Sequence, residues 1–190
     1  MIPQQKNNLY DFDGTIYDGN SSIDFFVFCL MHHPQLIKYV PQNIADLIKI
    51  KLNLLNLESS QTEYCKFITE IKNIDILILK FWKIYLKKIK KWYLIQKQDT
   101  DLIITSSPDF LIKPICKQLN VQLISTTTDN GRIIELCYQK EKLRMLNEKY
   151  PKETFDSFYT DSPKDDQILF QKAKNSYLVK GNKRIKIKNT

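Results

Sequence analysis

The sequence is poor in glycine and has no long hydrophobic run. Its 190 residues contain 4 glycines and no repeat or low-complexity tract, which argues against a disordered or repetitive protein. No run of about eighteen uncharged apolar residues is present. Residues 1–6 lack the apolar stretch of a secretory leader. From these absences we expect a soluble protein of the cytoplasm.

The cysteines are few and scattered. None of the 4 shows a Cys-x-x-Cys spacing, and the chain does not resemble a small secreted domain, so neither disulfide bridges nor a zinc site is predicted. We expect reduced, buried thiols at the four positions Cys29, Cys65, Cys116 and Cys137.

Positive charge is in excess, with a formal net charge of +8. Such an excess suits nucleic acid, an acidic membrane surface or a small anionic substrate. Most of it comes from lysine, and lysine, isoleucine and asparagine abound along the whole chain. A biased composition is therefore our first explanation, and no nucleic-acid partner is expected.

Two aspartates one residue apart follow a short strand-like segment near the start of the chain. Asp11 and Asp13 lie in the run Asp-Phe-Asp-Gly-Thr, directly after residues 8–10. Alternation along a strand makes both carboxylates project the same way. Gly14 allows a sharp turn whose backbone N–H groups can hold an anion. Taken alone, this pattern also suits an ordinary turn or a calcium-binding loop.

Three further motifs follow in a fixed order. They are the strand-like run ending in Thr-Ser-Ser-Pro at 102–108, Lys142 at a helix start, and the Thr-Asp-Ser-Pro-Lys-Asp-Asp segment within 158–166. Together with the first motif they resemble the four signature motifs of the haloacid dehalogenase-like hydrolase superfamily, in particular its phosphoserine phosphatase-like branch. The resemblance extends from Leu9 to about Val179.

The strand-like runs predict an α/β fold with an open, doubly wound parallel sheet of the Rossmann-like kind. The main runs are residues 9–12, 102–105, 121–125 and 155–160, with a last buried strand at 176–179 and an edge strand at 184–188. The first, second and fourth runs end in candidate catalytic residues. Ligands of such sheets bind beyond the carboxyl ends of the strands, so pattern and chemistry point to one place.

The segment 21–98 interrupts this alternation and has an almost wholly helical pattern. It is too long for a loop in a compact domain. We therefore predict a helical cap at 21–98, inserted into a core made of residues 1–20 and 99–190, as the resemblance also implies. Within 81–97, aromatic and apolar residues recur at helical spacing with lysines opposite. This pattern predicts one amphipathic helix with a solvated lysine face, or a face that meets an anionic substrate or membrane.

Other helices are predicted from caps and prolines. Ser107 followed by Pro108 is typical of an N-cap with proline at the first helical position. Pro114 is expected to interrupt or restart the helix that follows. Further helices are predicted at 141–150 and 164–173.

The resemblance implies roles for the first two aspartates. Asp11 would be the nucleophile that forms an aspartyl-phosphate, and Asp13 would protonate the leaving oxygen and then activate water. Dehalogenases of the superfamily lack a carboxylate at the position of Asp13, so its presence favours phosphoryl transfer. A phosphomutase or phosphotransferase stays open, because both use the same pair.

Several carboxylates beside a phosphate dianion call for a cation, and magnesium suits a partly hydrated, all-oxygen site. By resemblance its ligands would be the Asp11 side chain, the Asp13 carbonyl and the Asp161 side chain. Asp165 would orient a water or Lys142 from behind, although Asp166 beside it leaves that choice open by one residue. Phosphoryl oxygens would be bound by Lys142, Thr105, the Ser106 N–H and the turn at Gly14.

We therefore predict a magnesium-dependent phosphatase of a small phosphorylated metabolite. One alternative is a phosphatase of lipid phosphates at a membrane surface, suggested by the lysine-rich helix at 81–97. Another is a non-catalytic module that uses its positive charge to bind a nucleic acid or a protein, although every motif residue with a chemical role is present. Substrate and oligomeric state stay open.

Overall fold

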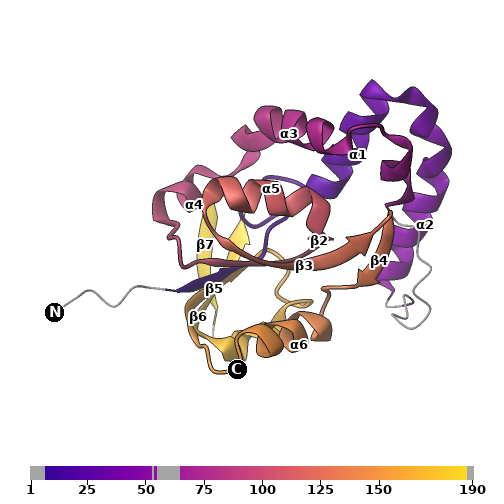
Figure 1. Ribbon diagram of the computed structural model, residues 1–190. Coiled ribbons are helices and arrows are strands. Elements are labelled where there is room, and N and C mark those ends of the chain that lie inside the picture. The colour runs from indigo at the N-terminus through magenta and orange to yellow at the C-terminus, as the bar shows by residue number, and fades with distance from the viewer. Residues whose placement is uncertain (1–6, 53, 55–64, 188–190) are drawn as a thin grey trace.

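A seven-stranded sheet runs through the computed structural model, which describes residues 7–52, 54 and 65–187. The strand order is β4-β3-β2-β1-β5-β6-β7 (Figure 1). The strands are β1 Asn8–Tyr10, β2 Leu102–Pro108, β3 Gln122–Asp129, β4 Arg132–Glu135, β5 Phe155–Thr160, β6 Ala173–Lys180 and β7 Lys183–Ile187. The five central strands pair in parallel, and β4 and β7 are antiparallel edges. This confirms the doubly wound α/β fold, with β4 as an unpredicted edge strand.

Successive residues of the central strands belong to two separate hydrophobic clusters. Tyr10 and Ile103 belong to the cluster on one face, and Leu9 and Leu102 belong to the cluster on the other. The first face is covered by α3 Ile74–Tyr85, α4 Lys91–Gln96 and α5 Asp109–Leu119, and the second by α6 Lys140–Lys149 and the short 3₁₀ helix η5 Gln167–Lys172 (Figure 1). Period-two alternation thus places a core on each side of the sheet.

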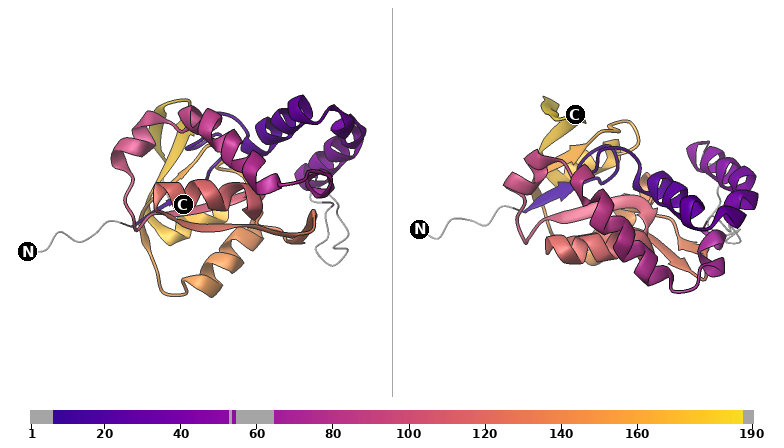
Figure 2. Two further views of the ribbon diagram at one scale, coloured as in Figure 1. Left: turned by 45° about the horizontal axis from the view of Figure 1, so that its top comes forward. Right: turned by 90° about the horizontal axis from the view of Figure 1, so that it is seen from above.

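The described part of the chain between β1 and β2 is mainly helical. Its further elements are α1 Ser21–His32, η1 Pro34–Tyr39, α2 Val40–Lys51, η3 Lys66–Glu70 and η4 Leu86–Lys88. Figure 2 shows α1 and α2 beyond one end of the sheet, whereas α3 and α4 lie over it. Aromatic residues of this segment and of the strands share one hydrophobic cluster. The division into a core and a cap at 21–98 stays a prediction. Among the described residues, no helix has the length and apolar character needed to cross a membrane.

The single amphipathic helix predicted at 81–97 is wrong. Helix α3 ends at Tyr85, and α4 begins at Lys91. Between them, Ile89 forms a β-bridge with Tyr17, and the Lys90 N–H donates to Ile16 O (2.8 Å). Backbone hydrogen bonds to the loop after β1 thus replace those that a continuous helix would make. The continuous lysine face on which the membrane-surface alternative was based does not form.

Two predicted helix boundaries also differ from the structure. Ser107 and Pro108 belong to β2, because Pro108 pairs with Thr126 after a register shift, so α5 begins one residue later without a side-chain cap from Ser107. Helix α5 then continues through Pro114, held by buried apolar residues on both sides. The predicted helix 164–173 is reduced to η5, because Ala173 pairs with Phe155 as the first residue of β6.

Candidate active site

Three neighbouring strands deliver the predicted site residues to one edge of the sheet. Asp11 directly follows β1, Thr105 lies near the end of β2, and Asp161 directly follows β5. Strands β2 and β5 flank β1 and run parallel to it. Their carboxyl ends therefore meet at one place, where ligands of such sheets bind. Ser106, next to Thr105, is exposed at this end of β2.

A buried lysine connects two carboxylates beneath this edge. Lys142, in the first turn of α6, is 4% exposed. Its Nζ donates to Asp11 Oδ1 (3.0 Å) and to Asp166 Oδ1 (2.7 Å). Burial lowers the pKa of Lys142, but the two carboxylates outweigh burial and raise it overall. The lysine is therefore held as a cation against Asp11.

The carboxylate behind Lys142 is Asp166 and not Asp165. Asp166 is buried, and its second oxygen accepts a hydrogen bond from Thr160 Oγ1 (2.6 Å). Asp165 is only half-buried and accepts a hydrogen bond from Gln139 (3.2 Å). Of the two residues that the sequence left open, the structure therefore places Asp166 against Lys142, and not Asp165. The backbone turn after Asp161 determines which of the two aspartates contacts Lys142. In this turn the N–H groups of Asp165 and Asp166 both donate to Ser162 O.

The two neighbouring aspartates allow a matched pair of substitutions. We expect Asp166→Asn to lower the free energy of unfolding by about 2 kcal/mol. The uncharged amide has one oxygen, so it can accept the hydrogen bond of either Lys142 or Thr160 but not both. Asp165→Asn should change it by less than about 0.5 kcal/mol. Urea unfolding of both variants measures the difference. Equal effects would contradict the assignment of Asp166 as the partner of Lys142.

Thr15 joins the loop after β1 to the loop after β5. Its Oγ1 donates to Asp11 Oδ2 (3.1 Å) and accepts a hydrogen bond from the Asp161 N–H (2.9 Å). Thr15 is fully buried, so this bridge is shielded from water. One hydroxyl thus fixes the distance between the first and last motifs. In the sequence, the only indication of this role was that Thr15 belongs to the first motif.

Gly14 makes room for Asp161. Gly14 has a φ of +71°, and a Cβ added there would lie 2.0 Å from Asp161 Oδ2. Both the backbone conformation and the close approach therefore require glycine. The Gly14 N–H, which the sequence suggested for anion binding, instead donates to Gly19 O (2.9 Å). The role of Gly14 in the structure is thus to admit the Asp161 carboxylate.

Asp13 is held by the start of α1 and by the end of β2. Its Oδ1 accepts a hydrogen bond from the Ser21 N–H (2.5 Å), and its Oδ2 accepts one from Ser107 Oγ (2.5 Å). Burial raises the pKa of Asp13, although these hydrogen bonds lower it. Ser107 is a contact that the sequence did not indicate, because its predicted role was to cap a helix.

Negative charge is crowded at this edge of the sheet. The pKa of Asp11 is raised to about 7, because burial and the charges of Asp166 and Asp161 together outweigh the opposing effect of Lys142. Burial also raises the pKa of Asp161. Among the described residues, no group of three or more His, Cys, Asp or Glu side chains is arranged as a metal cluster. The predicted ligands Asp11 and Asp161 are two such side chains, and the third predicted ligand is the Asp13 carbonyl.

Lys90 is a buried cation, although the sequence pattern predicted that it would lie on a solvated face. It is 6% exposed, and its Nζ donates to Gly14 O (2.5 Å). Burial lowers the pKa of Lys90, while the nearby charges of Asp18 and Asp161 raise it. The helix break at 86–90 turns this side chain inward. No signal in the sequence distinguished it from the neighbouring lysines.

Comparisons with known proteins agree with this geometry. A family model described as haloacid dehalogenase-like hydrolase matches residues 9–169. A protein of unknown function from Bordetella pertussis Tohama I has the same fold, with a TM-score of 0.66, 15% identity and coverage of 91% of this chain and 89% of that one. A phosphoserine phosphohydrolase-like protein from Francisella tularensis subsp. tularensis SCHU S4 superposes with a TM-score of 0.57, 16% identity and coverage of 90% and 86%. A search of curated proteins finds no match.

Proposed function

Because the chain belongs to the haloacid dehalogenase-like hydrolases, we propose that it is a magnesium-dependent phosphatase that hydrolyses a phosphomonoester through an aspartyl-phosphate at Asp11. The observation that carries the proposal is the buried Lys142 between Asp11 and Asp166, at the edge where Thr105 and Asp161 also lie. A cation held against a buried carboxylate suits a reaction in which that carboxylate meets an anionic phosphoryl group. The substrate is a small phosphorylated molecule.

Asp11 attacks phosphorus with one carboxylate oxygen. Lys142 and Thr15 each hold one oxygen of this carboxylate, which limits its rotation. Lys142 also offsets the charge that accumulates as the nucleophile and the phosphoryl group approach. Thr105 Oγ1 accepts a hydrogen bond from the Ser107 N–H (3.1 Å), which leaves the Thr105 hydroxyl proton to donate to a phosphoryl oxygen.

Asp13 acts as the general acid and then as the general base. The raised pKa of its carboxyl group suits it to deliver a proton to the leaving oxygen as the bond to phosphorus breaks. The resulting carboxylate then removes a proton from the water that hydrolyses the aspartyl-phosphate. Ser107 and Ser21 keep its two oxygens in place during both steps.

The donor set fits magnesium. The carboxylates of Asp11 and Asp161, with the Asp13 carbonyl, would hold the ion and supply the all-oxygen ligands that it prefers. Beyond the effect of burial, the charges of Asp166 and Asp161 raise the pKa of Asp11, and the charge of Asp166 raises the pKa of Asp161. The edge therefore has more negative charge than Lys142 alone balances. When bound, the ion neutralises phosphoryl charge and lowers the barrier to attack.

The proposal is tested by hydrolysis of an aryl phosphate with and without added magnesium. We expect turnover that disappears when the ion is removed with a chelator and returns when magnesium is restored, because the carboxylates then repel the phosphate dianion. Calcium, which prefers more ligands at longer distances, should support turnover less well. Unchanged turnover in the chelator would contradict the role of the metal.

Lys90 is predicted to position the loop that carries Gly14. Replacing it with Met removes the donor to Gly14 O and the nearby charge, so we expect kcat/KM to fall about tenfold, equivalent to ~1.4 kcal/mol. Lys91 is exposed, so Lys91→Met is the matched control and should leave kcat/KM unchanged. Steady-state kinetics with an aryl phosphate measure both. Equal kinetics for the two variants would show that Lys90 has no such role.

A further inference from the structure

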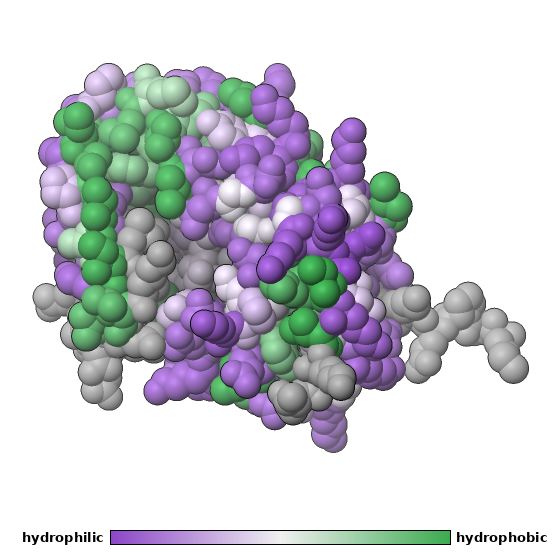
Figure 3. All heavy atoms as spheres, turned by 180° about the vertical axis from the view of Figure 1, so that it is seen from behind, coloured by the Kyte–Doolittle hydropathy of each residue, from purple (hydrophilic) through white to green (hydrophobic). Residues whose placement is uncertain are grey.

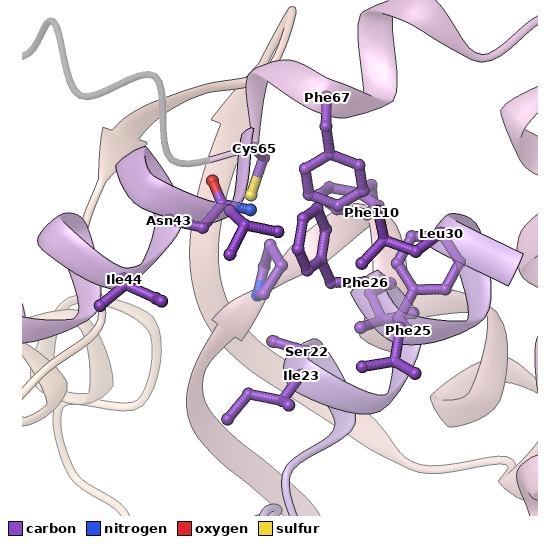
Figure 4. A pocket seen from close by; sticks show the side chains of 14 residues that line it. Ser22, Ile23, Phe25, Phe26, Leu30, Asn43, Ile44, Cys65, Phe67 and Phe110 are labelled. Atoms are coloured by element: carbon purple, nitrogen blue, oxygen red, sulfur yellow. The ribbon is translucent and has the colours of Figure 1, made fainter. Parts of the chain in front are cut away.

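A cavity of about 330 Å³ lies between α1, α2 and the start of α5. Its walls are almost entirely carbon, and no charged side chain lines it among the described residues. Figure 4 shows Phe26, Phe67 and Phe110 close together, with Asn43 and Ile44 of α2 across from them. Its volume is roughly twice that of a ~150 Å³ cavity that holds benzene. The cavity is therefore large enough for an apolar group of about ten carbon atoms.

Two hydrogen bonds connect this cavity to the predicted proton donor. Ser22 lines the cavity, and its Oγ lies 3.0 Å from Ser107 Oγ. Ser107 Oγ in turn donates to Asp13 Oδ2 (2.5 Å). Pro108, the next residue, is also part of the wall. The cavity thus lies on the Ser107 side of Asp13, with the side chains of Ser22 and Ser107 between its wall and that carboxylate.

The rim of the cavity is apolar as well. Ile23 and Val27 line it and are each 46% exposed, and Ile44 is 53% exposed. Seen from behind, hydrophobic residues extend along the edge of the molecule that α2 forms (Figure 3). An open mouth without charged groups on its wall suits an apolar occupant better than a zwitterionic one such as serine. Asn43 Oδ1 is buried without a hydrogen-bond partner among the described residues, so the wall can also accept one donor.

We propose that this cavity receives the alcohol portion of the substrate, so that the enzyme hydrolyses phosphomonoesters of apolar alcohols. The inference rests on the proposed phosphatase function. In the reaction, Asp11 forms a bond to phosphorus, the bond from phosphorus to the alcohol oxygen breaks, and Asp13 gives that oxygen its proton. The released alcohol lies in the cavity, and water then frees phosphate from Asp11. The leaving group is thus selected by burial of its carbon atoms.

The test compares substrates that differ only in apolar length. We expect kcat/KM for octyl phosphate to exceed that for ethyl phosphate at least about a hundredfold, because burial of only about half of its six additional methylene groups is enough for that ratio. Phosphoserine should be a poorer substrate than octyl phosphate. The ratio of kcat/KM for 2-naphthyl phosphate to kcat/KM for phenyl phosphate distinguishes aryl from alkyl alcohols. A higher kcat/KM for the larger member of either series supports the inference.

A variant that fills the cavity sharpens the comparison. Val27→Trp should reduce the octyl-to-ethyl ratio to about tenfold or less while ethyl phosphate is still hydrolysed. Met31 lies on the same helix, is 63% exposed and does not line the cavity, so Met31→Trp should keep the full ratio. Ile23→Trp, also at the rim, replaces Val27→Trp if that variant does not fold.

The outcomes separate the two proposals. A flat ratio for wild type, or one that Val27→Trp and Met31→Trp change equally, would overturn the assignment of the cavity and leave the phosphatase intact. Absence of hydrolysis for every phosphomonoester would overturn both. Binding of 1-octanol gives an independent readout: it should raise the Tm of wild type and Met31→Trp, but not of Val27→Trp.

Discussion

Replacing Asp11 with Asn is expected to abolish turnover while the protein stays folded. The amide cannot act as the nucleophile, so kcat should fall by about three orders of magnitude or more. The fold should tolerate the change, because burial already disfavours the charged form of Asp11, as its raised pKa shows. Asn also keeps an oxygen that can accept a hydrogen bond from Lys142 or Thr15. Steady-state kinetics and thermal unfolding measure the two effects separately.

The covalent step can be followed directly. After an acid quench during turnover, wild type should carry one phosphoryl group on the peptide that contains Asp11, and Asp11→Asn should carry none. Asp18 is an exposed aspartate of the same loop, so Asp18→Asn makes the same charge change away from the proposed chemistry. It should form the phosphorylated peptide as wild type does. Hydrolysis by Asp11→Asn at the wild-type rate would eliminate Asp11 as the nucleophile.

Replacing Lys142 with Met should damage both stability and activity. The substitution leaves Asp11 and Asp166 buried without their cation, and breaking a buried ion pair from one side costs about 3–5 kcal/mol. Turnover should fall as well, because the cation beside the nucleophile is lost. Denaturant unfolding gives the first effect, and kcat on the folded fraction gives the second.

Two further variants separate the charge effect from damage to helix α6. Lys140 is exposed at the start of the same helix, so Lys140→Met should change stability by less than about 0.5 kcal/mol. Combining Lys142→Met with Asp166→Asn removes one of the stranded charges and should recover part of the lost stability, but not the activity. If the double variant were no more stable than Lys142→Met, the loss would not arise from unpaired carboxylates.

Much of the fold could be predicted from local pattern. The apolar runs before Asp11, Thr105 and Asp161 predicted strands whose ends meet, because parallel strands deliver their carboxyl ends to one edge. Pairing across the sheet then lengthened some strands and shortened the helices next to them in the sequence. Ala173, predicted as helical, joins β6 because Phe155 offers it a partner strand. Such competition depends on residues far apart in sequence and leaves no local signal.

The sequence by itself determined the α/β class, which follows from strand periodicity, and the order of the motifs, whose resemblance to a known family singled out Asp11, Asp13 and Lys142 as candidates. Only the tertiary structure decided that Asp166 holds Lys142, that Lys90 turns inward to Gly14, and that an apolar cavity adjoins Asp13 through Ser107. The physical reason is the same in each case. Side chains on a turn or a broken helix take their direction from backbone hydrogen bonds to distant segments, and helical spacing alone does not reveal those bonds.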